Sequence, residues 1–293
     1  MNIAFCINCL GMLGLGGTLS SPIRNCSNQS QLKMWFLCAD MGDGEKSQIA
    51  LLLRAEGYTG EHTFIDFNQK HHFGSFPSLH GDWTAYGRLL LGDLVPEDQI
   101  LYLDSDLLVE VDVLEIANFD FTGHVLAAVG GGTFEYSLGQ DFYINTIGIP
   151  PTAAYFNSGV LLLNLAVWRQ QGTRDLCFDL AKQYLTVLPS HDESLLNMVC
   201  AGNFAKLPAS FNCQWEAAHP KPRVAEKMIL HFIGSPKPWD PFGSYLHNGY
   251  RLWHQYAERN WSGLFDKLTR AQLIRMWHIR RSYARCVLQK MKS

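Results

Sequence analysis

The 293-residue sequence predicts an α/β fold with parallel strands, organised as one domain with a C-terminal appendage. Apolar runs of strand length alternate with a helical segment at the start of the chain, at the spacing of βαβ units. Hydrophobic residues make up 47% of the chain and charged residues only 17%, which excludes a disordered protein. A chain of this length also buries enough surface to fold without disulfides.

The N-terminal part supplies the first of these elements. Residues 2–7, 33–39 and 62–67 are apolar runs of strand length, and residues 47–57 have helical length and end at a glycine. The glycine-rich stretch that follows the first strand is interpreted as a turn. It lacks a basic residue before Arg24, so it does not match a signal peptide.

The remaining helices and strands are predicted from the same kinds of pattern. Residues 84–95 have helical spacing before a proline, and residues 99–112 form a buried strand that ends in acidic residues. The later elements are a strand at 124–132, a strand running into a helix at 154–170, a helix at 192–202 and a loop-rich stretch at 203–250. We therefore predict a domain over residues 1–261 and a basic amphipathic helical extension over residues 262–293. No run of 18 apolar residues indicates a membrane span.

The eight cysteines indicate a compartment rather than a site. Only Cys6 and Cys9 are close in sequence, and no second Cys-x-x-Cys accompanies them. Zinc or redox chemistry is the alternative, but buried free thiols in a reducing compartment explain the pattern better. We therefore expect a cytoplasmic protein, and peripheral attachment to the cytoplasmic face of a membrane remains open.

The strongest chemical signal is an acidic pair at the end of a buried segment. In an extended strand, Asp104 and Asp106 project to the same side, and adjacent carboxylates repel each other unless a cation lies between them. Oxygen ligands suit Mg²⁺ or Mn²⁺, which keep open positions for substrate phosphates. A solvated turn or a helix cap is the alternative interpretation.

A later segment adds groups that suit a diphosphate. His231 lies in a strand-like run and can complete a carboxylate metal site. Gly234 lets the backbone approach a phosphate, and Lys237 supplies a positive charge. Together they would spread the negative charge of a departing nucleoside diphosphate. A histidine buried in the core is the alternative interpretation of His231.

The motifs AYGRL, LYLDSDLLV, YFNSGVLLLNL, HDESLLN and HFIGSPKPW resemble, in this order, those of glycosyltransferase family 8. This is the retaining family of glycogenin and of bacterial lipopolysaccharide galactosyl- and glucosyltransferases, and the likeness covers roughly residues 84–240. It implies a Rossmann-like fold of the GT-A type and a UDP-sugar donor, UDP-glucose or UDP-galactose. It also implies Mn²⁺ (or Mg²⁺) as the cofactor.

The resemblance implies roles for the matching residues. The metal ligands are Asp104, Asp106 and His231. The catalytic residues are Arg88, Asp192 and Glu193. The donor contacts are Asn8, Arg88, Ser105, Asn157, Ser158, Asp192, Gly234 and Lys237. Without the resemblance, Arg88 would be interpreted as a surface arginine, and the acidic pair at 192–193 as the capping of a helix.

Two departures from the family bear on function. Glu193 stands where many relatives carry glutamine, which makes a double displacement through this carboxylate chemically possible. We favour attack of the acceptor from the face of the departing diphosphate, with Glu193 stabilising positive charge at the anomeric carbon. After the first strand, Asn8 replaces an expected aspartate and the uridine-stacking aromatic is absent.

The predicted function is the transfer of a hexose from a UDP-sugar to a glycan acceptor, a lipopolysaccharide or another lipid-linked saccharide. The altered first loop leaves open a weakened nucleotide-sugar-binding protein. A nucleotidyltransferase would share the acidic metal site, but it would require a basic glycine-rich loop after the first strand, and this chain has none.

The net charge of −3 conceals an asymmetry. Residues 267–293 hold eight of the 24 lysines and arginines and none of the 27 acidic residues, so the rest of the chain carries −11. Apolar residues from Leu273 to Met291 recur at three- and four-residue steps, apart from one longer gap. A basic amphipathic helix with aromatics is typical of binding to an anionic membrane surface. A helix docked on the domain is the alternative, and nucleic acid is not an expected partner.

Overall fold

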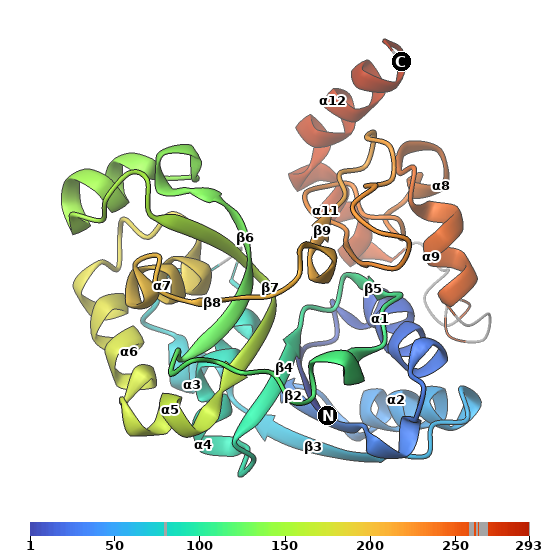
Figure 1. The fold of residues 1–293 in the computed structure, drawn as a ribbon. Coiled ribbons are helices and arrows are strands. Elements are labelled where there is room, and N and C mark those ends of the chain that lie inside the picture. Colours follow the sequence, from blue (N-terminus) through green and yellow to red (C-terminus); the bar gives the residue numbers. More distant parts are fainter. Residues whose placement is uncertain (79–80, 258–260, 262, 264–268, 293) are drawn as a thin grey trace.

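The computed structural model describes residues 1–78, 81–257, 261, 263 and 269–292, and it shows one large sheet between two layers of helices (Figure 1). In spatial order the sheet contains β3 (Glu61–Phe67), β2 (Lys33–Ala39), β1 (Asn2–Ile7), β4 (Gln99–Leu103), β7 (Ala154–Asn164), β6 (Leu126–Thr133) and β8 (Ala205–Lys206). Strands β3, β2, β1 and β4 are parallel, whereas β7 runs antiparallel to both β4 and β6. The predicted α/β class and its first three strands are confirmed.

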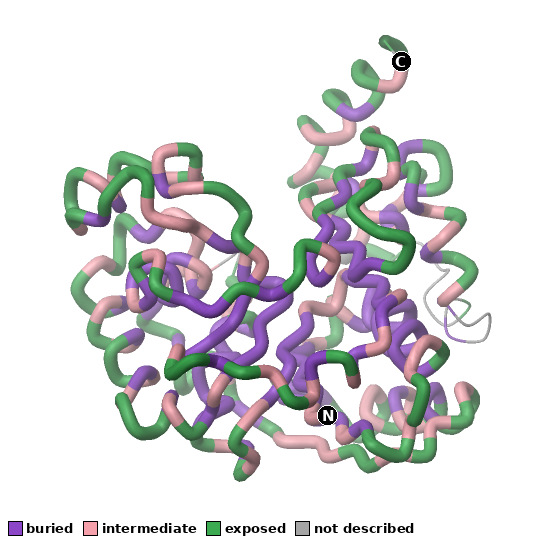
Figure 2. The backbone as a smooth tube through the Cα atoms, viewed as in Figure 1, coloured by how far each residue is buried: buried purple, intermediate pink, exposed green. Residues whose placement is uncertain are grey.

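The side chains of β1 alternate between the two sides of the core. Ile3 and Phe5 pack on one face, and Ala4 and Cys6 pack on the other, because successive side chains of a strand point in opposite directions. The first face is covered by α1 (Met12–Asn25) and α2 (Asp43–Ala55). The second is covered by α3 (Gln69–Phe73), the 3₁₀ helix η2 (Thr84–Leu90), α4 (Leu91–Leu94), α5 (Leu165–Gln170), α6 (Thr173–Gln183) and α7 (His191–Cys200). The buried chain runs through the middle of the molecule in Figure 2.

The glycine-rich stretch after β1 is the helix α1, so its interpretation as a turn was wrong. Cβ atoms added at Gly14, Gly16 and Gly17 would lie 2.5 Å, 2.3 Å and 2.9 Å from atoms of three different tryptophans. The glycines therefore allow indole rings from the C-terminal part of the chain to lie directly on the helix backbone. This long-range packing outweighs the low helix propensity of glycine.

Residues 99–112 were predicted to form one strand, and this prediction was wrong. They divide into β4 and β5 (Leu107–Val109), and β5 belongs to a second, small sheet with β10 (Ile229–His231) and β9 (Cys213–Gln214). The acidic pair lies in the link between the two sheets. The link brings β10, which pairs antiparallel with β5, alongside the end of the large sheet.

The C-terminal part contains α8 (Gly243–Leu246), α9 (Tyr250–Tyr256), α11 (Arg270–His278) and α12 (Arg280–Lys290). The expected single amphipathic helix is therefore two helices that meet at Ile279. The predicted domain boundary at residue 262 lies outside the described residues. Among those described, no helix is long and apolar enough to cross a membrane. All eight cysteines are free thiols, and six are buried.

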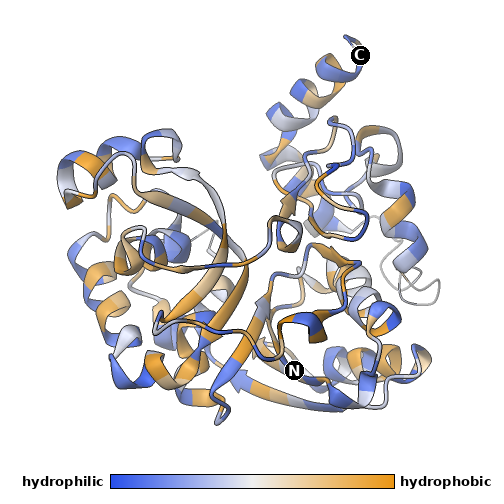
Figure 3. Cartoon of the chain, viewed as in Figure 1, coloured by the Kyte–Doolittle hydropathy of each residue, from blue (hydrophilic) through white to orange (hydrophobic). Residues whose placement is uncertain are grey.

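The two terminal helices contact the domain through a few specific groups. The Arg275 guanidinium donates to both carboxylate oxygens of the buried Asp240, at 2.7 Å and 3.0 Å. The Tyr283 hydroxyl donates to the Pro241 carbonyl at 2.8 Å, and Cys286 is buried. Helix α12 projects from the body of the molecule in Figure 1, and it carries both hydrophobic and hydrophilic residues in Figure 3.

Candidate active site

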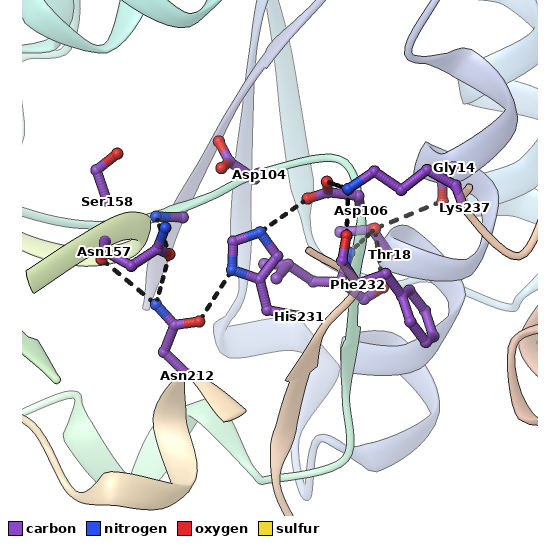
Figure 4. Close-up of polar contacts among 12 residues, drawn as sticks. Gly14, Thr18, Asp104, Asp106, Asn157, Ser158, Asn212, His231, Phe232 and Lys237 are labelled. Carbon is purple, nitrogen blue, oxygen red and sulfur yellow. Dashed lines mark hydrogen bonds and ion pairs between the residues drawn. The ribbon is translucent and has the colours of Figure 1, made fainter. Parts of the chain in front are cut away.

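The acidic pair and the predicted histidine meet where the two sheets join. Asp104 and Asp106 follow β4, and His231 is the last residue of β10, paired with Leu107 in register. One ligand atom from each lies within 4.8 Å of the others. Asp106 Oδ1 is 3.3 Å from His231 Nε2. Figure 4 marks this contact with a dashed line. The sequence predicted this cluster for a partly wrong reason, since a link and not a strand holds the aspartates together.

One feature of the cluster indicates that it fits a divalent cation. Asp106 Oδ1 is buried and accepts no hydrogen bond, although a buried carboxylate oxygen without a partner is costly. Two carboxylates and an imidazole are ligands that suit Mg²⁺ or Mn²⁺. The three side chains therefore provide an acceptor set that a cation would complete.

Gly159 makes room for the imidazole. A Cβ added to this residue of β7 would lie 2.3 Å from His231 Cε1 and 3.0 Å from Asp104 Oδ2. Contacts this short do not occur in real structures, so a larger side chain would displace the histidine or the aspartate. The glycine of the YFNSG motif thus serves the cluster by having no side chain.

Lys237 lies against the outer oxygen of Asp106. Its Nζ donates to Asp106 Oδ2 at 2.7 Å and to the Phe232 carbonyl (Figure 4). Burial raises the pKa of Asp106, but that pKa lies below its ordinary value, and the Lys237 ammonium is the largest of the opposing influences. Gly234 is exposed in the same loop, with a φ of +67° that favours glycine. The lysine keeps this carboxylate ionised.

Arg88 joins the acidic pair to the helix α7. Only 3% exposed, it donates to Asp104 Oδ1 at 2.9 Å and to the Ser158 carbonyl at 2.6 Å, and its Nε lies 3.0 Å from Asp192 Oδ2. Its guanidinium also lies over the Tyr102 ring, 4.1 Å from the centroid. Burial lowers the pKa of Arg88, but the neighbouring acidic groups have the larger effect, so the pKa lies above its ordinary value. The residue is therefore a buried, permanent cation and not a surface arginine.

Glu193 is held by a set of donors from β7. The Tyr155 hydroxyl donates to Oε1 at 2.7 Å, and the Ser158 N–H and Asn157 Nδ2 each donate to Oε2 at 3.0 Å. Burial raises the pKa of Glu193, and the Ser158 N–H and the Tyr155 hydroxyl oppose that rise. Burial also raises the pKa of Asp192, against the effect of Arg88. The neighbouring carboxylates are thus stabilised by different partners.

A family model for glycosyl transferase family 8 matches residues 2–242, which include every site residue named above. The chain belongs to glycosyltransferase family 8. The resemblance found in the five motifs is confirmed, and so is the GT-A fold. The solved structure of the galactosyltransferase LgtC, in complex with donor and acceptor sugar analogues, superposes with a TM-score of 0.74. It is 25% identical in sequence, over 90% of this chain and 99% of LgtC.

Two curated relatives show how far the likeness extends. The glycosyltransferase GlyE of Streptococcus pneumoniae is 26% identical over 253 residues, which are 83% of this chain. This chain spans only 58% of the length of GlyE. The lipopolysaccharide 1,3-galactosyltransferase of Salmonella typhimurium is 25% identical over 287 residues, covering 93% of this chain and 83% of that enzyme.

Asn8, which replaces the aspartate expected near the nucleoside, already makes hydrogen bonds within the chain. Its Nδ2 donates to Asp82 Oδ2 at 2.9 Å and to Thr84 Oγ1 at 2.8 Å, while its Oδ1 accepts the N–H groups of Leu10 and Gly11. It therefore fixes the turn between β1 and α1. Asp82 was not singled out from the sequence.

Other residues that contact this cluster were missed because nothing in the local sequence marks them. Asn212, in the loop-rich stretch, contacts both Asn157 and His231 (Figure 4). Tyr102 donates to Asp104 Oδ1 at 2.7 Å from inside an apolar strand. Asn157 and Asn212 also line a cavity of about 250 Å³ beside β6. Only the fold brings these polar groups to one place.

Proposed function

We propose that this protein is a metal-dependent, retaining glycosyltransferase that transfers a hexose from a UDP-sugar to a glycan acceptor. One observation carries the proposal: Asp104 belongs to two clusters at once. It lies with Asp106 and His231 in the acceptor cluster, and it is paired with Arg88, which also holds Asp192. A cation-binding end and a buried carboxylate end therefore adjoin, as transfer of a sugar from a diphosphate requires.

At the diphosphate end, Asp104, Asp106 and His231 would hold Mn²⁺ (or Mg²⁺). An ion bound there would stabilise the negative charge that develops on the departing diphosphate. Lys237 supplies a fixed positive charge in the same place, and Gly234 leaves its backbone N–H accessible to a phosphate oxygen. The nucleoside would lie toward Asn8 and Ser105, beside the start of α1.

At the sugar end, Arg88, Asp192, Asn157 and Ser158 would bind the donor hexose. Asp192 can accept hydrogen bonds from sugar hydroxyls while Arg88 compensates its charge. UDP-galactose and UDP-glucose are the proposed donors. LgtC and the Salmonella enzyme are both named as galactosyltransferases, which supports the first of these.

We propose front-face attack, with Glu193 stabilising the positive charge at the anomeric carbon. Its carboxylate accepts at least three hydrogen bonds, which spread its charge and make it a weaker nucleophile. The acceptor would give its proton to the leaving diphosphate. Retention of configuration then requires no covalent glycosyl-enzyme, although Glu193 is the carboxylate that a double displacement would use.

The proposed acceptor is a lipopolysaccharide or another lipid-linked glycan. The name of the Salmonella relative supports this class, and the cavity beside β6 offers a place next to Asn157 for an acceptor sugar. The test is to incubate the protein with a panel of nucleotide sugars and Mn²⁺ and to measure UDP release with and without candidate acceptors. Release with one donor, increased by one acceptor, is expected. No release from any donor would favour a binding protein, and pyrophosphate-dependent chemistry a nucleotidyltransferase.

We further propose that α11 and α12 attach the enzyme peripherally to an anionic membrane on its cytoplasmic face. Large apolar side chains remain exposed on both helices and just after α12, among them Trp277, Leu288 and Met291. Exposed arginines such as Arg281 and Arg285 accompany them. An exposed apolar surface flanked by basic residues suits a membrane that carries negative charge.

Vesicle flotation tests the membrane proposal. Wild-type protein should float with vesicles containing anionic lipid and not with purely zwitterionic ones, and Trp277→Gln/Met291→Gln should float much less. The matched control is Tyr136→Gln/Leu138→Gln, which removes two equally exposed apolar side chains far from these helices in the sequence. Equal flotation of the two double variants would contradict the proposal.

A further inference from the structure

A chain of side-chain amides leads from Glu193 to the predicted metal ligand His231. Its first member, Asn157, has a fixed orientation. The backbone N–H of Gly159 donates to Asn157 Oδ1 at 3.1 Å, so the atom facing it must be the amide oxygen. The amide nitrogen therefore points the other way, to Glu193 Oε2 at 3.0 Å. Two unambiguous partners thus set this amide.

Asn212 takes its orientation from Asn157. Its Nδ2 donates to Asn157 Oδ1 at 3.0 Å and to the Asn157 backbone carbonyl at 3.4 Å, and both are acceptors only. The Asn212 amide oxygen then faces His231, 3.0 Å from Nδ1 (Figure 4). Because an amide oxygen cannot donate, the imidazole Nδ1 must carry the proton.

This assignment decides what the other ring nitrogen does. A neutral imidazole has one N–H, so a proton on Nδ1 leaves a lone pair on Nε2. Nε2 lies 3.3 Å from Asp106 Oδ1, the buried oxygen that accepts no hydrogen bond. Two lone pairs that face each other in a buried place repel, unless a cation lies beside them. His231 is therefore presented as a ligand before any ion arrives.

We propose that Asn212 is a positioning residue: held by Asn157, it fixes His231 in the tautomer that binds metal, and it connects the Glu193 carboxylate to the metal end. Partners of the second ring nitrogen orient metal-binding histidines and raise their basicity. The inference rests on the metal binding proposed above. The tautomer itself is measured without metal, so the two ideas can fail separately.

The first experiment determines the tautomer in the metal-free wild-type protein. Long-range ¹H–¹⁵N spectra distinguish a protonated from an unprotonated ring nitrogen, and the signals of His231 are those missing from His231→Gln. We expect a proton on Nδ1 and none on Nε2, at a pH where the ring is neutral. A proton on Nε2 in the wild type would overturn the proposal without any variant of Asn212.

The second experiment measures Mn²⁺ binding in the presence of UDP by the EPR signal of free Mn²⁺. Asn212→Leu keeps the volume but removes the acceptor, and its affinity should fall roughly 10–100-fold. Asn212→Asp still offers an oxygen to Nδ1–H, although it no longer donates to Asn157, and its affinity should fall by less than that of Asn212→Leu, to within about tenfold of wild type. The matched control is Asn203→Leu, which removes a 3.0 Å contact between an asparagine oxygen and His124 away from the site.

The pattern among the variants separates positioning from packing. Unchanged affinity and tautomer in Asn212→Leu would contradict the proposal, and so would an equal loss in the Leu and Asp variants. Circular dichroism establishes that each variant is folded. If Asn212→Leu does not fold, the wild-type tautomer and the affinity of Asn212→Asp still decide the question. Wild-type protein that binds no Mn²⁺ with UDP would refute the metal site and leave the tautomer result standing.

Discussion

The two ends of the site differ in how their charges are balanced. At the sugar end, Arg88 pairs with Asp104 and Asp192, and Glu193 accepts hydrogen bonds from three residues of β7. At the proposed metal end, Lys237 occupies one oxygen of Asp106, but the other oxygen accepts no hydrogen bond and faces His231 Nε2. The protein thus completes one end with its own groups, and it leaves a buried carboxylate oxygen without a donor at the other.

The difference follows from the cations that the chain places at each end. An arginine presents several donors in a fixed plane and stays charged when buried, so Arg88 alone can serve two carboxylates and a carbonyl. A lysine is a single point of charge, and Lys237 reaches only the outer side of Asp106. The side of Asp106 that faces His231 is therefore left without a donor from the chain.

The largest expected effect comes from removing the positive charge of Arg88 at the sugar end. Arg88→Gln leaves Asp104 and Asp192 without their cation in a buried place, and the free energy of unfolding should fall by about 3–5 kcal/mol. UDP release should fall below detection. Urea denaturation followed by circular dichroism measures the first effect, and the donor assay measures the second.

The control for Arg88 is an arginine with the same kind of partners at the surface. Arg174 also pairs with two aspartates, Asp93 and Asp175, but all three side chains are exposed. Arg174→Gln should change the free energy of unfolding by no more than about 1 kcal/mol. Equal losses in the two variants would mean that burial does not distinguish the sugar end.

A smaller effect should follow from displacing the His231 imidazole at the proposed metal end. Gly159→Ala places a Cβ 2.3 Å from His231 Cε1, so the imidazole must move away from Asp106. We expect Mn²⁺ affinity in the presence of UDP to fall by about tenfold or more, with a stability loss of about 1–3 kcal/mol. The EPR titration described above measures the affinity.

Gly44 provides the control for this substitution. A Cβ added there meets no atom within 4 Å, so Gly44→Ala should leave Mn²⁺ affinity unchanged and should not destabilise the helix α2. If Gly159→Ala binds Mn²⁺ as tightly as Gly44→Ala, the position of His231 is not what the metal end depends on.

The smallest effect is expected from a substitution at the sugar end that keeps the hydrogen bonds of residue 193. In Glu193→Gln, the side-chain oxygen can still accept from Ser158 N–H and Asn157 Nδ2, and the new amide can donate to the Tyr155 hydroxyl. Activity should therefore stay within about tenfold of wild type, since the hydrogen bonds are kept. The rate of sugar transfer at saturating donor measures it.

Glu193→Ala gives the contrast, because it leaves the donors of β7 without an acceptor and should lose much more activity. A loss of more than about a thousandfold in Glu193→Gln, with donor binding intact, would instead support Glu193 as the nucleophile of a double displacement. Detection of a covalent glycosyl-enzyme by mass spectrometry would point the same way.

The parts of this fold that the sequence could predict are those written in local patterns. Apolar runs and a glycine stop were enough for β1, β2 and α2, whereas α1 was misassigned because its glycines are explained only by indole rings from the far end of the chain. In the site, Asp-x-Asp and the HFIGSPKPW motif pointed to a metal cluster. Asn212 could not be found, because its meaning depends on Asn157 and His231, which lie 55 and 19 residues away.

The contact between Arg275 and Asp240 bears on where the functional unit ends. The family match stops at residue 242, so Asp240 lies inside it and Arg275 outside. Asp240 Oδ2 also accepts the backbone N–H of Lys237 at 2.7 Å, so this buried carboxylate stands between the C-terminal helix and the loop that carries the lysine. Cutting the chain after residue 265 would leave the buried Asp240 carboxylate without its guanidinium, next to the proposed diphosphate contact Lys237. The unit that must be kept whole in any chimera or truncation is therefore defined by this ion pair, and it extends beyond the last residue that the family model matches.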